Sequence, residues 1–115
     1  MAEILRANAY ELAMIDAASA GNPVKEMQYD ATIAAAQLDF FAGLVTEMKG
    51  SSVPMGPGAV SFSVREPIGV VARIIPFNHP FMFCAGKSAV PLAAGNSIIV
   101  NRQNRRPCLR CVLQN

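Results

Sequence analysis

Histidine, cysteine and long apolar runs are scarce in this chain, which argues against several functions. His79 is the only histidine and has no partner for a metal site, and one Cys-x-x-Cys pair is weak support for zinc or redox chemistry. Lys87 and Pro91 interrupt the most apolar stretch, so no membrane-spanning helix is expected. Because the N-terminus lacks the features of a secretory signal, we expect a cytoplasmic protein.

Charged residues make up only 16% of the 115 residues, whereas hydrophobic residues make up 52% and the mean hydropathy is +0.30. A self-contained soluble domain of this size is usually less apolar, so we interpret the chain as part of a larger fold. Charge is also unevenly distributed. Residues 1–100 hold six basic and eight acidic side chains, whereas residues 101–115 hold four arginines, no acid and two of the three cysteines. This break separates a domain from a tail.

Apolar periodicity predicts two N-terminal helices. In residues 3–20, apolar side chains recur at spacings of three and four, at Leu5, Ala9, Leu12 and Ile15, and the Gly-Asn-Pro sequence at 21–23 ends the pattern. A second helix is predicted over residues 24–49, with Gly50 as its C-terminal cap. Its expected apolar stripe consists of Ile33, Leu38, Phe41, Leu44, Val45 and Met48. Two such helices suit a layer that packs on another part of the protein.

The next segment is predicted to hold one strand. Residues 51–58 are rich in proline and glycine and have no periodicity, so we expect an exposed connection there. In residues 60–64, Val60, Phe62 and Val64 alternate with polar residues, which is typical of a strand with one solvated face.

Residues 70–100 are predicted to form a βαβ unit. Residues 70–75 are β-branched and almost all apolar, which indicates a strand buried on both faces, as in a parallel sheet. Residues 81–94 read as a buried helix that Pro91 kinks or ends, and residues 97–100 as a second inner strand. The fold class predicted from this order is α/β.

Asn78 is the residue that we single out for chemistry. It lies in IIPFNHP, residues 74–80, where a buried strand reaches the carboxyl edge at which open α/β sheets bind ligands. Pro76 and Pro80 restrict the backbone on either side. An amide fixed there can donate a hydrogen bond to an oxygen that gains negative charge in acyl chemistry. The alternative, which spacing alone favours, is that Asn78 caps the helix that starts near residue 81.

Two segments resemble a known family. REPIGVVARIIPFNHP (residues 65–80) and AGKSAVPLAAGNSIIV (residues 85–100) strongly resemble the aldehyde dehydrogenase superfamily, and a looser similarity extends back through residues 21–23 and 38–50. The resemblance implies oxidation of a small-molecule aldehyde with NAD or NADP through a cysteine thiohemiacetal, which passes hydride to the nicotinamide and is then hydrolysed. It also implies a homo-oligomer, and we expect no nucleic-acid or membrane partner.

The resemblance also implies site residues and domains. Asn78 aligns with the asparagine that stabilises the thiohemiacetal oxygen, and no metal is implied. The residues implied to bind the cofactor are Ile74, Ile75, Pro76, Phe77 and Asn78. The implied fold is incomplete: an N-terminal helical layer (1–50), a connection with one strand of a small oligomerisation sheet (51–67), and the start of a Rossmann-like NAD(P)-binding domain (68–100).

Several parts of the family's site are expected beyond residue 115. By resemblance these are the nucleophilic cysteine, the general-base glutamate and the glycine-containing helix start that binds the pyrophosphate. Cys84 lies in an apolar helical pattern, so we expect a packed, inert thiol there. We therefore expect this chain alone to be poorly folded or aggregating and to have no turnover.

The tail NRQNRRPCLRCVLQN, residues 101–115, departs from the family. Asn101 and Asn104 fall where the resemblance places a ribose-binding lysine and a cofactor-side glutamate, in a stretch similar to KPAEQTPLSALRLAE. Codons can be chosen that encode the observed tail and that, with one purine restored after the first two bases, encode KPAEQTPLSALRLAE. The second base of each restored codon after the first is then the first base of an observed codon, which the genetic code fixes for every residue of the tail except arginine and leucine. We interpret the tail as the product of a reading-frame shift in the gene or in the sequence read.

Two other functions remain open. The chain can be a non-catalytic piece that pairs with an intact subunit through the edge of the 60–64 strand. Alternatively, the arginines and the Cys108–Cys111 pair can form a module that binds metal or nucleic acid, although we expect neither ligand.

Overall fold

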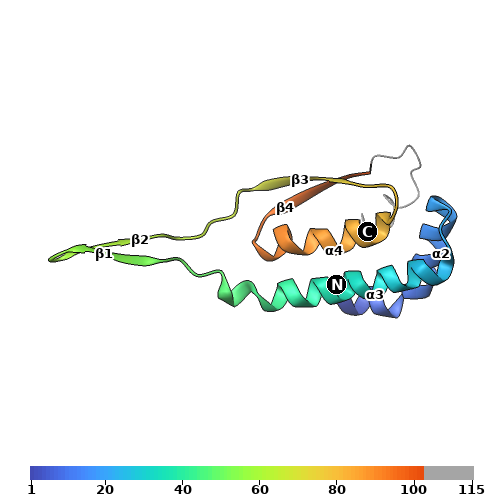
Figure 1. The fold of residues 1–115 in the computed structure, drawn as a ribbon, viewed down its shortest axis with the longest axis horizontal. Coiled ribbons are helices and arrows are strands. Elements are labelled where there is room, and N and C mark those ends of the chain that lie inside the picture. The colour runs from blue at the N-terminus through green and yellow to red at the C-terminus, as the bar shows by residue number, and fades with distance from the viewer. Residues whose placement is uncertain (103–115) are drawn as a thin grey trace.

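The N-terminal part of the molecule is a layer of three helices (Figure 1). The structure, a computed structural model, describes residues 1–102. Helix α1 spans Ala2–Ala7, α2 spans Ala9–Ala20 and α3 spans Val24–Gly43. Gly21 ends α2 in the left-handed conformation, with φ of 82°, as the Gly-Asn-Pro sequence predicts.

The helix predicted over residues 3–20 is divided at Asn8. The Asn8 side chain donates from Nδ2 to the Ile4 carbonyl oxygen at 2.8 Å. Short polar side chains that bond to nearby backbone groups compete with helical hydrogen bonding, which explains why the break falls at this residue.

The prediction that the second helix reaches residue 49 is wrong. Helix α3 ends at Gly43, and a 3-10 turn, Val45–Glu47, follows it, so Gly50 is not its cap. Leu44, Val45 and Met48, which were expected in the apolar stripe, are exposed. The buried positions of α3 stop at Leu38, and a helix gains most of its stability from packing of its buried face.

Helix α4, Pro80–Ala93, packs on α3 through small side chains. A Cβ built on Gly86 would lie 3.5 Å from the Cα of Ala34 and 2.1 Å from Oε1 of Gln37, so the two helices approach closely at this glycine. Phe81 is 1% exposed and is the largest fully buried side chain of residues 1–102. Alanines form much of the surrounding core, at positions 31, 34, 35, 85 and 89.

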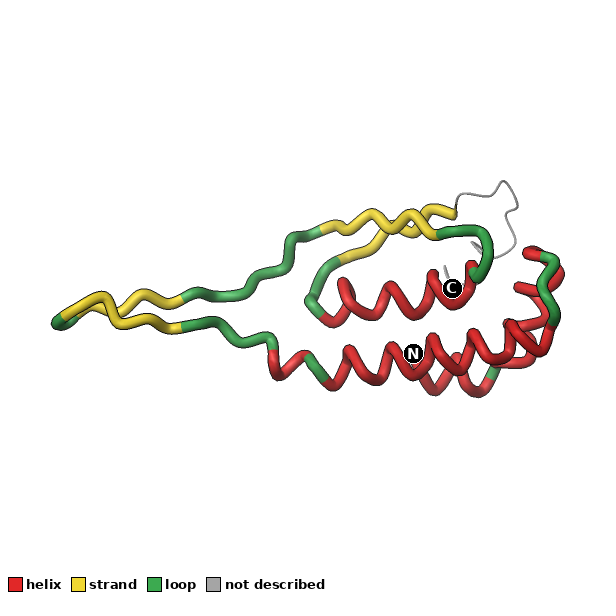
Figure 2. Tube along the Cα trace, viewed as in Figure 1, coloured by secondary structure: helices red, strands yellow, loops and turns green. Residues whose placement is uncertain are grey.

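The predicted βαβ unit is present. Strand β3, Val70–Ile75, and strand β4, Ser97–Arg102, are parallel neighbours whose register runs from Val70 opposite Ser97 to Ile75 opposite Arg102. Figure 2 shows α4 between this sheet and α3. Pro91 lies inside α4 and does not end it. The α/β fold class is therefore confirmed, as part of an incomplete fold.

The prediction that β3 is buried on both faces is not met within residues 1–102. Its residues alternate between exposed and less exposed positions, and Ile75 alone is buried. Helix α4 contacts the sheet, whereas the side chains of Val70, Ile74 and Ile99 are more than half exposed. One face of the sheet thus has no cover in the part of the chain that the structure describes.

Residues 51–62 form a hairpin, which corrects the prediction of a connection over residues 51–58. Strand β1, Ser52–Gly56, pairs antiparallel with β2, Ala59–Phe62. Pro54 and the glycines conceal the strand pattern, and Gly56 and Gly58 take positive φ values at the turn. Every residue of both strands is exposed. The prediction that only one face of the second strand is solvated is therefore not met within residues 1–102. The hairpin projects away from the helices (Figure 1).

The predicted frame-shifted tail lies outside the described residues, apart from Asn101 and Arg102 at the end of β4. None of the helices within residues 1–102 has the length and apolar character needed to cross a membrane.

Candidate functional site

The loop of residues 76–79 joins the carboxyl end of β3 to the start of α4. The carboxyl end of β4 lies beside it, because Ile75 pairs with Arg102 in the parallel register. This is the edge at which open α/β sheets bind ligands, and the predicted site residues Ile74 to Asn78 all fall there.

His79, not Asn78, is the N-cap residue of α4. Its φ and ψ are −134° and 65°, and no side chain caps the helix end by a hydrogen bond. Pro80 follows in the first turn, where its fixed φ suits a helix start. The alternative interpretation of Asn78 as a helix cap is therefore wrong.

Asn78 is held through its backbone. The Asn22 side chain donates from Nδ2 to the Asn78 carbonyl oxygen at 2.6 Å. Asn78 is exposed, and within residues 1–102 its side-chain amide makes no hydrogen bond. The contact fixes the main chain of Asn78 while its side-chain donor stays available.

The next residue is joined to α3 by a buried carboxylate. Nδ1 of His79 lies 2.7 Å from Oδ2 of Asp30, whose side chain is 5% exposed. A carboxylate only accepts hydrogen bonds, so Nδ1 carries the proton in this pair. The His79 ring also meets the ring of Phe83 edge to face, with centroids 6.5 Å apart. His79 therefore packs at the start of α4.

A second buried acid holds the first turn of α4. The Phe81 backbone N–H donates to Oδ2 of Asp16 at 3.3 Å, and the Asp16 side chain is fully buried in α2. Sequence reasoning missed Asn22, Asp16 and Asp30. The available signal was an acid at helical spacing from buried apolar residues, as Asp16 stands four positions after Leu12.

A family model described as the aldehyde dehydrogenase family matches residues 1–114. The chain belongs to the aldehyde dehydrogenase family. The match confirms the resemblance that the segments 65–80 and 85–100 carry.

The relatives of this aldehyde dehydrogenase chain are much longer than it is. It is 44% identical over 115 residues to the aldehyde dehydrogenase tropH of Talaromyces stipitatus, across 95% of this chain and 22% of the relative. The crystal structure of PnpE in complex with nicotinamide adenine dinucleotide matches with a TM-score of 0.88 and 34% identity, across 96% of this chain and 23% of PnpE. The chain thus spans about a fifth of these proteins.

A third match carries a different nucleotide. The crystal structure of glyceraldehyde-3-phosphate dehydrogenase from Methanocaldococcus jannaschii, complexed with NADP, matches with a TM-score of 0.84 and 32% identity. It covers 96% of this chain and 24% of that chain. Both nucleotides therefore occur among structures that share this fold.

The described residues fit one wall of a nucleotide site. Ile74 is 73% exposed and Phe77 is 65% exposed, and both present apolar surface at the carboxyl end of the sheet. Pro76 is exposed as well, whereas Ile75 is 4% exposed, so its side chain belongs to the interior. The loop 76–79 contains no glycine and is not a glycine-rich phosphate loop. These residues suit the apolar part of a nucleotide rather than its pyrophosphate.

Cys84 is a buried structural thiol in this aldehyde dehydrogenase chain, as predicted. It is 6% exposed. Burial, with a smaller contribution from the Asp16 charge, raises the pKa of the Cys84 thiol to about 11. A thiol that stays protonated at neutral pH is a poor nucleophile. Cys108 and Cys111 lie outside the described residues.

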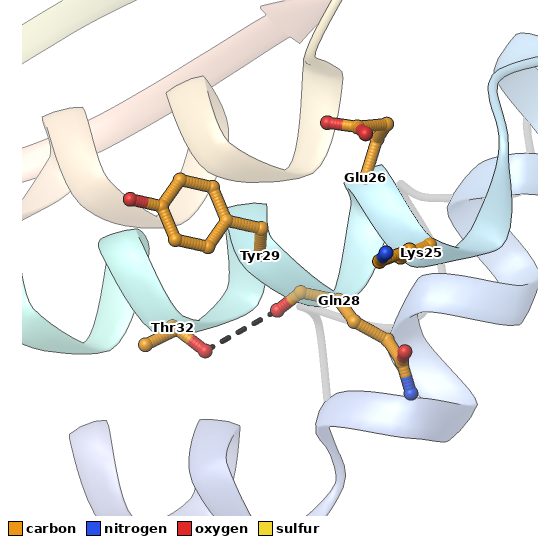
Figure 3. Close-up of a pocket in the computed structure, with 5 residues that line it drawn as sticks. All are labelled: Lys25, Glu26, Gln28, Tyr29 and Thr32. Carbon is orange, nitrogen blue, oxygen red and sulfur yellow. Dashed lines mark hydrogen bonds between the residues drawn. The ribbon is translucent and has the colours of Figure 1, made fainter.

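A surface hollow on α3 lies apart from this chemistry. It has a volume of about 450 Å³ and is lined by Lys25, Glu26, Gln28, Tyr29 and Thr32 (Figure 3). All five residues come from one helix, and no side chains from a second element converge on them. Within residues 1–102, no three His, Cys, Asp or Glu residues are grouped so that they could hold a metal ion.

Proposed function

We propose that this chain is the N-terminal part of the catalytic unit of a cytoplasmic, NAD(P)-dependent aldehyde dehydrogenase, which oxidises a small-molecule aldehyde to a carboxylic acid. The observation that carries the proposal is the position of Asn78. In a chain of this family, its free amide stands at the carboxyl end of β3 on a backbone held by Asn22.

Asn78 would stabilise the oxygen of the thiohemiacetal. A preorganised donor aimed at a developing oxyanion typically contributes about 10²–10³ in rate. The backbone contact from Asn22 supports this role, because it holds in place the main chain that carries the donor.

Ile74, Pro76 and Phe77 would form the apolar wall of the nucleotide site, with Ile75 contributing through its backbone and Asn78 at the edge. Bound NAD or NADP would accept the hydride. The apolar wall would exclude water from the reacting atoms, which strengthens the hydrogen bond that Asn78 donates.

We further propose that the 115-residue chain has no turnover by itself. The cysteine that the structure describes, Cys84, is buried with its pKa raised to about 11, which leaves the described residues without a reactive thiol. In the proposal, the nucleophile and the general base are supplied by sequence that relatives carry after the matched region.

A chimera tests this proposal. Residues 1–100 replace the matching segment of the Talaromyces stipitatus relative, and reduction of NAD or NADP by a panel of aldehydes is followed by absorbance. We expect turnover by the chimera and none by the 115-residue chain. A chimera that folds and binds nucleotide but oxidises no aldehyde accepted by the parent would contradict the proposal, as would turnover by the 115-residue chain.

We also propose that the sequence from residue 101 onward is out of frame. Asn101 pairs with Ile74 in the register of the sheet, so a lysine at position 101 would stand beside the proposed nucleotide wall. The DNA around codon 101 tests this. We expect the bases to rephase into KPAEQTPLSALRLAE, and codons that cannot be rephased into that peptide would refute the frame shift.

The exposed hairpin favours a second candidate, a non-catalytic piece that pairs with an intact subunit. Strand β2 pairs only with β1 among the described residues, which leaves its other edge open. Co-purification of the 115-residue chain with a full-length subunit tests this candidate. Loss of co-purification on substituting Val60→Pro, which removes a backbone donor, would support pairing through β2.

A further inference from the structure

We propose that Asn22 and Asp30 are positioning residues that hold the loop of Asn78 in its reactive geometry. This inference rests on the proposed function of Asn78. It concerns two residues on the helical layer that lie 56 and 49 positions from their partners in the chain.

The Asn22 contact restrains Asn78 itself. Its Nδ2 donates to the Asn78 carbonyl oxygen at 2.6 Å, so it fixes the peptide plane that follows Asn78 and leaves the reactive amide unengaged. Asn22 stands between Gly21 in the left-handed region and Pro23 in the extended region. Its Nδ2 also lies 3.9 Å from the sulfur of Met27, which is fully buried. The direction of the Asn22 side chain is therefore set by its surroundings.

The Asp30 contact restrains the residue after Asn78. A carboxylate that is 5% exposed is costly to bury without a partner, and the Nδ1 of His79 at 2.7 Å supplies one. Because Asp30 lies on α3, the pair joins the loop to the rigid core of the helical layer. Removing the acceptor leaves the His79 ring free to turn.

The distribution of polar contacts separates positioning from general packing. Hydrogen bonds from the helical layer reach Asn78, His79 and Phe81, at the start of α4. Further along, α3 and α4 meet through alanines and at Gly86, and within residues 1–102 no side-chain hydrogen bond joins the two helices there. The fold of α4 thus has its own apolar support, and the polar contacts add precision at the loop.

A double-mutant cycle in the chimera tests the inference. Asn22→Leu removes the donor at similar volume, and misplacement of the Asn78 amide should lower kcat between about tenfold and a hundredfold, with KM for aldehyde and nucleotide nearly unchanged. In the Asn78→Ala background, Asn22→Leu should lower kcat no further. Equal losses in both backgrounds would contradict positioning and indicate general destabilisation.

Asp30 provides the conservative comparison. Asp30→Asn keeps an oxygen that can accept a hydrogen bond from Nδ1 of His79 and should retain most of kcat. Asp30→Leu should lower kcat, but it should cause no further loss in the Asn78→Ala background. The matched control is Asn8→Leu. This variant removes the 2.8 Å hydrogen bond from Nδ2 of Asn8 to the Ile4 carbonyl oxygen, which is not part of the loop, and it should leave kcat unchanged. Equal kcat for Asp30→Asn and Asp30→Leu would overturn the role of Asp30.

The outcomes for the two proposals are distinguishable. If Asn78→Ala leaves kcat unchanged, the proposed role of Asn78 fails. If Asn78→Ala lowers kcat and Asn22→Leu does not, the positioning inference alone fails. Amide hydrogen exchange in the chimera gives a readout without catalysis. We expect faster exchange at residues 77–79 in Asn22→Leu than in the unaltered chimera, and equal exchange would count against the inference.

Discussion

Two phenylalanines show how differently two regions of this molecule are built. Phe81 stands at the start of α4 and is 1% exposed, whereas Phe62 ends β2 in the hairpin and is 75% exposed. The loop before Phe81 is joined to the helical layer by Asn22 and Asp30, and the hairpin strands pair with each other. The proposed site is therefore positioned by contacts inside this chain, while the hairpin presents an apolar surface that residues 1–102 do not cover.

The largest effect on stability is expected at Phe81. In the chimera, Phe81→Ala should lower the free energy of unfolding by about 3–5 kcal/mol, because it opens a cavity between α3 and α4. Phe62→Ala, measured at a concentration that keeps the protein monomeric, should change it by less than about 0.5 kcal/mol. Chemical denaturation measures both. Equal losses of unfolding free energy for the two variants would contradict the proposed difference between the packed start of α4 and the exposed hairpin.

The hairpin should instead matter for assembly. We expect Phe62→Asp to lower the oligomeric mass of the chimera, since it places a charge on the apolar surface that would meet another subunit. Light scattering after size-exclusion chromatography measures the mass, and the glutamine variant Thr46→Gln, outside the hairpin, serves as control. An unchanged oligomeric mass for Phe62→Asp would contradict a role of the hairpin in oligomerisation.

The smallest effect concerns pH and Cys84. Its pKa of about 11 in the folded chain lies above its usual 9.0, so the buried thiol favours the protonated state. The stability that this provides is complete below pH 9.0 and is lost as the pH rises through about 11. Cys84→Ala in the chimera should reduce the fall in stability across that interval. Denaturation at several pH values measures the change, and an identical pH dependence in both proteins would contradict it.

Local pattern was sufficient for part of this fold. The β-branched run of β3 and the apolar run of α4 predicted the βαβ unit, and Gly21 predicted the end of α2. Strand β1 was missed because Pro54 and the turn glycines mask its alternation, and the end of α3 was missed because its last turns lack packing. These errors arise where tertiary contacts, present or absent, outweigh periodicity.

The location of the candidate site could be predicted from the sequence, whereas the contacts that hold it could not. Asn78 could be singled out because it follows a β-branched, apolar strand and lies between two prolines. The Asn22 and Asp30 contacts bridge 56 and 49 residues, and no local pattern encodes which helix face meets which loop. The buried acids were detectable only as charges at apolar helix positions.

In the proposed function, Asn78 donates to the oxygen that gains charge during aldehyde oxidation. The most direct measurement is kcat for Asn78→Ala in the chimera, with melting and nucleotide binding measured on the same samples. We predict a loss of about 10²–10³ in kcat, with both other properties retained. A kcat within about twofold of that of the unaltered chimera would contradict this role of Asn78, because the change would be too small for a lost oxyanion donor.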